Sequence, residues 1–219
     1  MVPEGKLTPQ KLALAAFFVS ILLSGLAAAV GFLLELPFMF FFAGMTVGLV
    51  WAYNFPPFRL AYRGRGEVLQ AIGVGLVLPS AGFYLQCGAI APLPWPALIP
   101  SFLLGWAGNL LTSLPDQPSD QATGKNTYAV RKGPLAARRR AVLAIAIAAC
   151  AVPLVVPRAP PWAHVALAAP PLVCVLTAAR SLAVADAEQR DACRRFVTLA
   201  AAAANLALIG WTIALFVLR

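Results

Sequence analysis

Long uninterrupted apolar runs constrain the fold of this chain more than any other feature of its sequence. A helix needs about 20 residues to cross the hydrocarbon core of a bilayer, at about 1.5 Å of rise per residue. Seven stretches reach or approach that length: Leu12–Leu34, Phe38–Tyr53, Val68–Ile90, Trp95–Leu114, Ala141–Val156, Ala163–Ala179 and Phe196–Leu218. Hydrophobic residues make up 61% and charged residues 11% of the 219 residues, and a soluble domain of this size needs more polar surface. The sequence therefore predicts an all-α, polytopic transmembrane bundle of about seven helices, folded as a single domain over residues 1–219.

The positions of the charged residues predict how these helices are oriented. With a cytoplasmic N-terminus and alternating sides, every Lys and Arg except Arg158 and Arg219, 15 of 17, falls on the cytoplasmic side. All acidic residues except Glu35 fall there too. This distribution follows the positive-inside rule. We therefore expect an integral protein of the cell (inner) membrane, with its N-terminus and active face cytoplasmic and its C-terminus outside. The net charge of +9 is explained in this way without nucleic acid as a partner.

The longest polar segment on the predicted cytoplasmic side, residues 115–140, contains the side chains best suited to chemistry. Asp116 and Asp120 are four residues apart and would share one face of a helical turn. Two carboxylates suit Mg²⁺, which takes a few carboxylate oxygens together with water and substrate phosphates. Lys125 and Arg131 follow, and such cations bind phosphate oxygens. These residues by themselves fit either a metal-bridged diphosphate site or a solvated loop with an incidental D-x-x-x-D pattern.

A second polar segment, residues 54–67, lies on the same predicted side, directly after the second apolar stretch. It adds Arg59, Arg63 and Arg65 to the positive charge at that side. Tyr53 lies at the end of the preceding stretch, where an aromatic residue of the membrane interface is also expected.

Together the two polar segments resemble the UbiA superfamily of intramembrane aromatic prenyltransferases, most closely the branch that prenylates 1,4-dihydroxy-2-naphthoate in menaquinone synthesis. The family pattern Y-x-x-P-P-x-R-L, followed by Y-R-G-x-G-E, is matched by Tyr53, Pro56, Pro57, Arg59, Leu60, Tyr62, Arg63, Gly64, Gly66 and Glu67. The pattern D-x-x-x-D, followed by G-K-x-T and A-V-R-x-G, is matched by Asp116, Asp120, Gly124, Lys125, Thr127, Ala129, Val130, Arg131 and Gly133. Two long motifs in the right order are far more specific than either one by itself.

The resemblance implies an enzyme that transfers a prenyl chain from a polyprenyl diphosphate to an aromatic acceptor similar to dihydroxynaphthoate, with Mg²⁺ as cofactor. It implies that Asp116 and Asp120 are metal ligands and catalytic residues, that Tyr53 is catalytic, and that Arg59, Lys125 and Arg131 bind the diphosphate. Tyr53 would face the developing allylic cation, because the face of an aromatic ring attracts positive charge.

One part of the family pattern is not found in this sequence. Members of the family are similar in having nine spanning helices, with an N-D-x-x-D motif after the second. Residues 1–9 resemble the segment that follows that motif. We therefore expect residues 1–219 to lack the two N-terminal helices and the first aspartate motif, which an upstream segment or a second chain would supply. The activity of residues 1–219 by themselves would then depend on that missing part.

The alternative class is a non-catalytic membrane protein: a catalytically inactive remnant, an assembly partner or a transporter. The seven predicted stretches contain no Asp, Glu, Lys or Arg, whereas ion-coupled transporters place such residues near the bilayer midplane. This difference argues against ion coupling; the remnant, the assembly partner and a transporter without ion coupling stay as alternatives to the enzyme.

Overall fold

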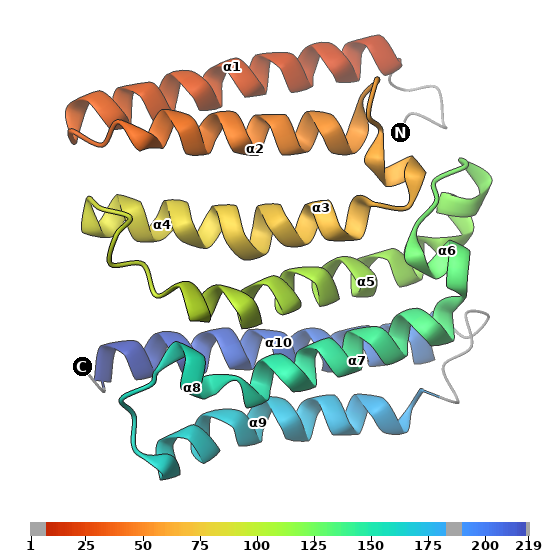
Figure 1. The fold of residues 1–219 in the computed structure, drawn as a ribbon. Helices are drawn as coiled ribbons and strands as arrows, with labels where there is room; N and C mark the ends of the chain where they lie inside the picture. The colour runs from red at the N-terminus through yellow and green to blue at the C-terminus, as the bar shows by residue number, and fades with distance from the viewer. Residues whose placement is uncertain (1–7, 183–189, 218–219) are drawn as a thin grey trace.

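Helices cover all seven predicted stretches in the computed structural model, which describes residues 8–182 and 190–217 (Figure 1). The principal helices are α1 (Pro9–Leu33), α2 (Phe38–Asn54), α3 (Gly66–Ile72), α4 (Leu78–Cys87), α5 (Leu98–Ala122), α7 (Pro134–Cys150), α9 (Pro161–Arg180) and α10 (Arg190–Val217). A turn of π-helix, η2 (Gly73–Val77), joins α3 to α4, and the short helices are η1 (Leu60–Arg63), η3 (Trp95–Ala97), α6 (Tyr128–Lys132) and α8 (Val152–Val155). The described residues contain no strand, so the predicted all-α class is confirmed.

The structure gives fewer full-length spans than the sequence predicts. Five segments of the described chain are long and apolar enough to cross a membrane: Gln10–Leu33, Gly66–Cys87, Trp95–Ala122, Pro161–Arg180 and Asp191–Val217. Helices α2 and α7 have 17 residues each, somewhat fewer than the about 20 that a straight span needs. Helix α7 ends before Pro153, whose ring nitrogen cannot donate the hydrogen bond that would continue the helix. The polytopic bundle is confirmed, with five full-length spans and two shorter helices.

Helix α5 continues beyond the end of the predicted stretch at Leu114. It ends at Ala122, with Pro115 and Pro118 inside it. A proline removes a backbone hydrogen bond and normally favours the end of a helix. Helix α5 packs against α3, η2, α7 and α10, but its residues after Leu114 are mostly exposed, and of these Asp120 is buried. The helix therefore ends later than the apolar stretch predicted, and both aspartates lie in its last turns with the helical spacing that the sequence predicted.

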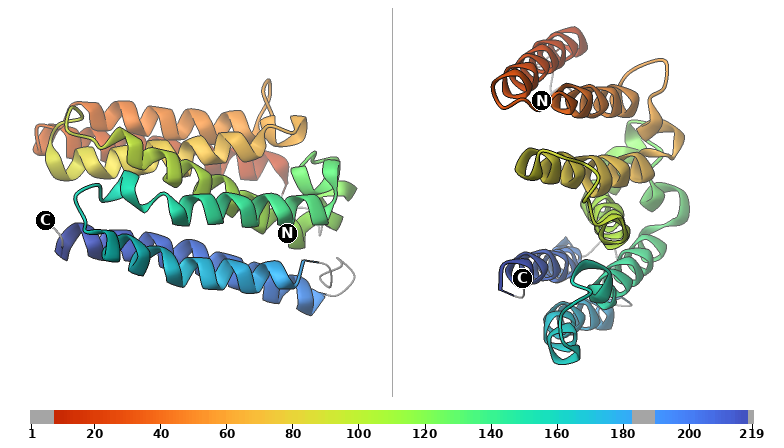
Figure 2. Two further views of the ribbon diagram at one scale, coloured as in Figure 1. Left: turned by 60° about the horizontal axis from the view of Figure 1, so that its bottom comes forward. Right: turned by 60° about the vertical axis from the view of Figure 1, so that its left-hand side comes forward.

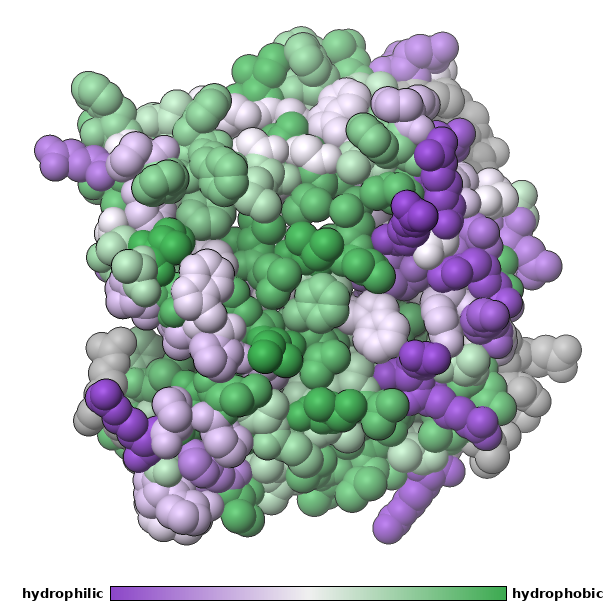
Figure 3. All heavy atoms as spheres, viewed as in Figure 1, coloured by the Kyte–Doolittle hydropathy of each residue, from purple (hydrophilic) through white to green (hydrophobic). Residues whose placement is uncertain are grey.

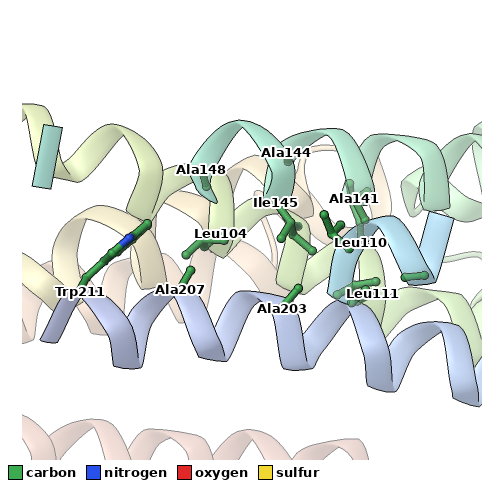
Figure 4. Packing of buried hydrophobic residues seen from close by; sticks show 14 of the residues in the cluster. Leu104, Leu110, Leu111, Ala141, Ala144, Ile145, Ala148, Ala203, Ala207 and Trp211 are labelled. Carbon is green, nitrogen blue, oxygen red and sulfur yellow. The ribbon is translucent and has the colours of Figure 1, made fainter. Parts of the chain in front are cut away.

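The helices lie nearly parallel, and their order in space largely follows their order in the chain. The end-on view of Figure 2 shows an arc with α1 at one end and α9 and α10 at the other. The main apolar core is formed by α5, α7, α9 and α10 (Figure 4), where Ala207 lies next to Leu104 and Ala203 lies near Ile145. Small side chains let helix backbones approach closely. At the other end of the arc, α1 packs mainly against α2, and only 6% of its apolar window is buried.

A very close approach joins η2 to α5. An added Cβ at Gly75 would lie 2.5 Å from Cα of Phe102 and 2.7 Å from the backbone oxygen of Ser101. Such distances exclude any side chain at Gly75 without a movement of the backbone. This contact fixes the segment that follows α3 against the helix that carries the aspartate pair.

Hydrophilic side chains gather at the end of the bundle where η1 and α6 lie, and an apolar band covers the middle (Figure 3). This distribution agrees with the predicted concentration of charge at one membrane face, while the identity of that face stays a prediction. The charged residues Glu4, Lys6, Asp186, Glu188 and Arg219, which also entered the topology prediction, lie outside the described residues.

Candidate active site

The polar end of the bundle brings together three of the predicted site residues from two helices and a turn. Asp120 lies in the last turn of α5, and Tyr53 lies near the end of α2. After α5 the chain turns back at Gly124, which has a φ of +73°, a value that glycine adopts without strain. The turn places the Lys125 Nζ 3.4 Å from the Asp120 Oδ1 and 6.0 Å from the centroid of the Tyr53 ring. Lys125 therefore lies between the acid of α5 and the aromatic face of α2.

The two aspartates of the pair differ in environment, although they belong to one helix. Asp116 is exposed, whereas the side chain of Asp120 is 8% exposed. Its Oδ1 contacts Lys125, while its Oδ2 is buried and has no hydrogen-bond partner among the residues that the structure describes. A buried carboxylate oxygen without a partner is costly, and such an oxygen is available as a ligand for a hard cation.

This arrangement fits one side of a magnesium site rather than a complete site. The described residues contain no cluster of three or more His, Cys, Asp or Glu side chains. Asp120, with Asp116 one turn before it, would hold the ion together with water and substrate oxygens, as Mg²⁺ commonly is held.

Lys125 is held in its charged form by its neighbours. Burial acts to lower the pKa of Lys125, but the interactions with Tyr53, Asp120 and Asp116 outweigh it and raise this pKa above its ordinary value of 10.5. The ammonium group keeps its positive charge at physiological pH and is suited to bind an anionic substrate group.

Arg59 lies apart from this group. It is exposed, has a φ of +43°, and its guanidinium carbon lies 4.1 Å from the centroid of the Tyr62 ring. In the part of the chain that the structure describes, Arg59 forms no ion pair with Asp116 or Asp120. Its predicted contact with a diphosphate stays a prediction.

Arg131 contacts the other polar segment of the chain. Its Nη2 lies 4.0 Å from the Glu67 Oε2 and donates a hydrogen bond of 2.9 Å to the backbone oxygen of Gly64. Glu67 is 4% exposed and also accepts a hydrogen bond from the backbone nitrogen of Tyr128. The predicted role of Arg131 in diphosphate binding also stays a prediction.

An apolar groove of about 330 Å³ begins at Tyr53 and lies between α2 and the α3–η2 segment. Its walls include Leu49, Val50 and Val74, and the polar residues Thr46, Asn54 and Gln70 also line it. Gln70 accepts a hydrogen bond from the side chain of Asn109 on α5. The groove is largely apolar, and one of its lining residues, Tyr53, lies near the charged group of Lys125; this combination suits an amphiphilic ligand with an anionic head.

Comparison with known proteins agrees with the motifs and the fold. Residues 1–209 match the model of the UbiA prenyltransferase family. The chain belongs to this family. It is also similar to a protein of Synechocystis sp. named 2-carboxy-1,4-naphthoquinone phytyltransferase, with 31% identity over 93 residues. The alignment covers 41% of this chain and 29% of that relative, so it spans less than a third of the relative's length. No solved structure matches the chain.

Two features of this UbiA-family site were not assigned a role from the sequence. Glu67 was matched within the Y-R-G-x-G-E motif without a partner, and the structure pairs it with Arg131. Gln70 and Asn109 are polar residues inside two of the apolar stretches; the structure joins their side chains by a hydrogen bond, and Gln70 also lines the groove. The signal for both was a polar residue placed beside or within an apolar run, because such a residue needs a partner when it is buried.

Proposed function

We propose that this chain binds a polyprenyl diphosphate and takes part in the transfer of its prenyl group to an aromatic acceptor of the dihydroxynaphthoate class, in quinone biosynthesis. Family membership supports prenyl transfer, and the printed name of the Synechocystis relative supports a naphthoquinone-type acceptor. The observation that carries the proposal is the grouping of the Asp120 carboxylate and the Lys125 ammonium near Tyr53, whose side chain also lines an apolar groove.

In this proposal the diphosphate lies at the polar end and the isoprenoid chain lies along the groove. The Lys125 ammonium binds diphosphate oxygens and lowers the energy of the leaving group as negative charge develops on it. Mg²⁺ held by Asp120 and Asp116 would supply further charge neutralisation for the diphosphate. Arg59, whose guanidinium lies over the Tyr62 ring, would add positive charge at the solvent-exposed edge of the same polar end.

The reaction produces an allylic cation and a diphosphate anion, and the Tyr53 ring would stabilise the cation. The bond between C1 of the prenyl group and the diphosphate oxygen breaks, and the electron pair leaves with the diphosphate. The acceptor ring then forms a carbon–carbon bond to the allylic C1 and loses a proton or carbon dioxide. The Tyr53 ring already lies 6.0 Å from one cation, the Lys125 ammonium, and its face would stabilise the allylic cation in the same way.

The membrane environment is part of the proposal. The chain is an integral membrane protein by its helices and its family. We place the polar end, and with it the site, at the cytoplasmic face of the inner membrane. A diphosphate could then enter from water while the isoprenoid chain stays in the apolar phase.

The proposal is tested by binding first and transfer second. The purified chain in liposomes is incubated with labelled farnesyl diphosphate, with and without Mg²⁺, and then with dihydroxynaphthoate. We expect binding that depends on Mg²⁺ and weakens at least about tenfold in Asp120→Asn, because one ligand worth about 1.4 kcal/mol is removed. Asp191→Asn, which changes an exposed acid at the start of α10, is the matched control and should bind as the unaltered protein does.

If farnesyl diphosphate does not bind under any of these conditions, the enzyme proposal fails and a non-catalytic membrane protein becomes the better description. Equal binding by Asp120→Asn and Asp191→Asn would remove Asp120 from the site.

A further inference from the structure

Two polar segments that are far apart in the chain meet at an ion pair between the buried carboxylate of Glu67 and the more exposed guanidinium of Arg131. We propose that Glu67 and Arg131 form a positioning pair that holds Tyr53 and Lys125 in their mutual arrangement, and that Gly64 must be glycine for the pair to form. The consequence for catalysis rests on the proposed function, whereas the structural role of the pair does not.

Glu67 is the anchor of the pair on α3. Its carboxylate is almost completely buried, and both of its oxygens are used by the segment around α6. One oxygen accepts the backbone N–H of Tyr128, which is the first residue of α6, and the other faces Arg131. A buried carboxylate is tolerated when it is paired and hydrogen-bonded, so Glu67 ties α3 to α6.

Arg131 makes the return connection from α6 to the first polar segment. Its guanidinium contacts the Glu67 carboxylate, donates to the backbone oxygen of Gly64, and lies 5.8 Å from the centroid of the Tyr128 ring. An arginine engaged on a carboxylate and a carbonyl at once uses the planar geometry that a lysine lacks.

Gly64 is shaped to receive this guanidinium. Its φ is +70°, and an added Cβ would lie 2.8 Å from both Cζ and Nε of Arg131. A side chain at residue 64 would displace the guanidinium from the Gly64 oxygen and from the Glu67 carboxylate.

The Glu67–Arg131 pair affects the site through residues that are adjacent to it in the chain. Gly66, next to Glu67, packs so closely on the Tyr53 ring that an added Cβ would lie 3.0 Å from Cε2 of Tyr53. Lys125 lies two residues before Thr127, the residue that caps α6. Holding α3 against α6 therefore holds the ring of Tyr53 near the ammonium of Lys125.

Amide hydrogen exchange on the full chain in detergent micelles tests the pair without any need for activity. We expect Arg131→Gln and Gly64→Ala each to raise exchange at least about tenfold in peptides that cover residues 124–133. Gly88→Ala is the matched control, because Gly88 has a nearly identical φ of +71° but its added Cβ would approach nothing closer than 3.9 Å. It should leave exchange in residues 124–133 unchanged. Unchanged exchange in both Arg131→Gln and Gly64→Ala would overturn the proposal.

Kinetics or binding then separate positioning from direct substrate contact. A positioning pair predicts that Arg131→Gln and Gly64→Ala lower kcat at least about tenfold, with KM for farnesyl diphosphate changed by less than about threefold, because misplaced groups slow the chemical step. A large rise in KM for Arg131→Gln and none for Gly64→Ala would identify Arg131 as a diphosphate ligand instead and overturn the proposal. If the unaltered chain transfers no prenyl group while the exchange result holds, the proposed function fails and the positioning pair stands.

Discussion

Lys125→Met removes a charge but keeps the length of the side chain, and it leaves Asp120 without its ion-pair partner. At the observed separation of 3.4 Å, the Coulomb energy in an effective dielectric of about 20 is about 5 kcal/mol. Desolvation and side-chain entropy offset part of this energy. Removing one partner of a buried pair costs about 3–5 kcal/mol. Because the Lys125 side chain is 27% exposed, we expect the lower end of that range, a loss of about 3 kcal/mol in the free energy of unfolding.

Asp120→Asn should cost less than Lys125→Met, and this asymmetry follows from burial. When Asp120 is neutralised, the partly exposed Lys125 can turn to water, whereas the buried Asp120 cannot do so when Lys125 is removed. We expect Asp120→Asn to cost about 1 kcal/mol and the two residues to be coupled by about 2 kcal/mol. The double variant should therefore be less damaged than Lys125→Met.

Equilibrium unfolding of the single and double variants in mixed micelles measures this coupling. Lys132→Met is the matched control, since Lys132 is exposed, and it should change stability by no more than about 0.5 kcal/mol. Additive effects of the two single changes, or a larger loss for Asp120→Asn than for Lys125→Met, would refute the argument from burial.

Three further changes test other parts of the structure. Gly75→Ala should destabilise the protein by about 3 kcal/mol, because the added Cβ would lie 2.5 Å from the backbone of Phe102. Gly82→Ala is the control: nothing lies within 4 Å of the added Cβ, so it should be neutral or stabilising in the same unfolding experiment. Folding raises the pKa of Lys125, so its stabilising contribution is complete below pH 10.5 and is lost as the pH rises through the folded pKa. When unfolding is measured at increasing alkaline pH, the free energy of unfolding should therefore fall less in Lys125→Met than in the unaltered protein. Tyr53→Phe keeps the ring face and should keep prenyl transfer within about twofold, whereas Tyr53→Leu should lower kcat about tenfold, the effect of about 1.4 kcal/mol of cation–π stabilisation.

The sequence was sufficient for the architecture because each helix carries its own local signal. Apolar runs predicted all seven helical regions, and the family motifs located the polar segments that form the site. The errors concern ends and lengths. The apolar stretch ended at Leu114, whereas α5 continues to Ala122. Hydropathy marks where an apolar run stops, but the backbone hydrogen bonds of a helix can continue into polar residues.

Partner choice at the site could be predicted only in part. The motifs named Asp120, Lys125 and Tyr53, and the structure brings these three together. They also grouped Arg131 with the diphosphate ligands, which stays a prediction, but they did not indicate its contacts with Glu67 and Gly64. A charge in the sequence shows that an ion pair can form, but the nearest opposite charge is set by how the helices pack.

The sequence by itself determined that this chain is an all-α membrane protein of the UbiA family, because hydropathy and motifs are properties of short segments. The tertiary structure decided that Asp116 is exposed while Asp120 is buried, although the two lie one turn apart on the same helix. It also decided that Tyr53 meets Lys125, by packing α3 against α5 and joining α3 to α6. Burial and proximity depend on which helix faces lie against each other, and this is why they appear only in the folded chain.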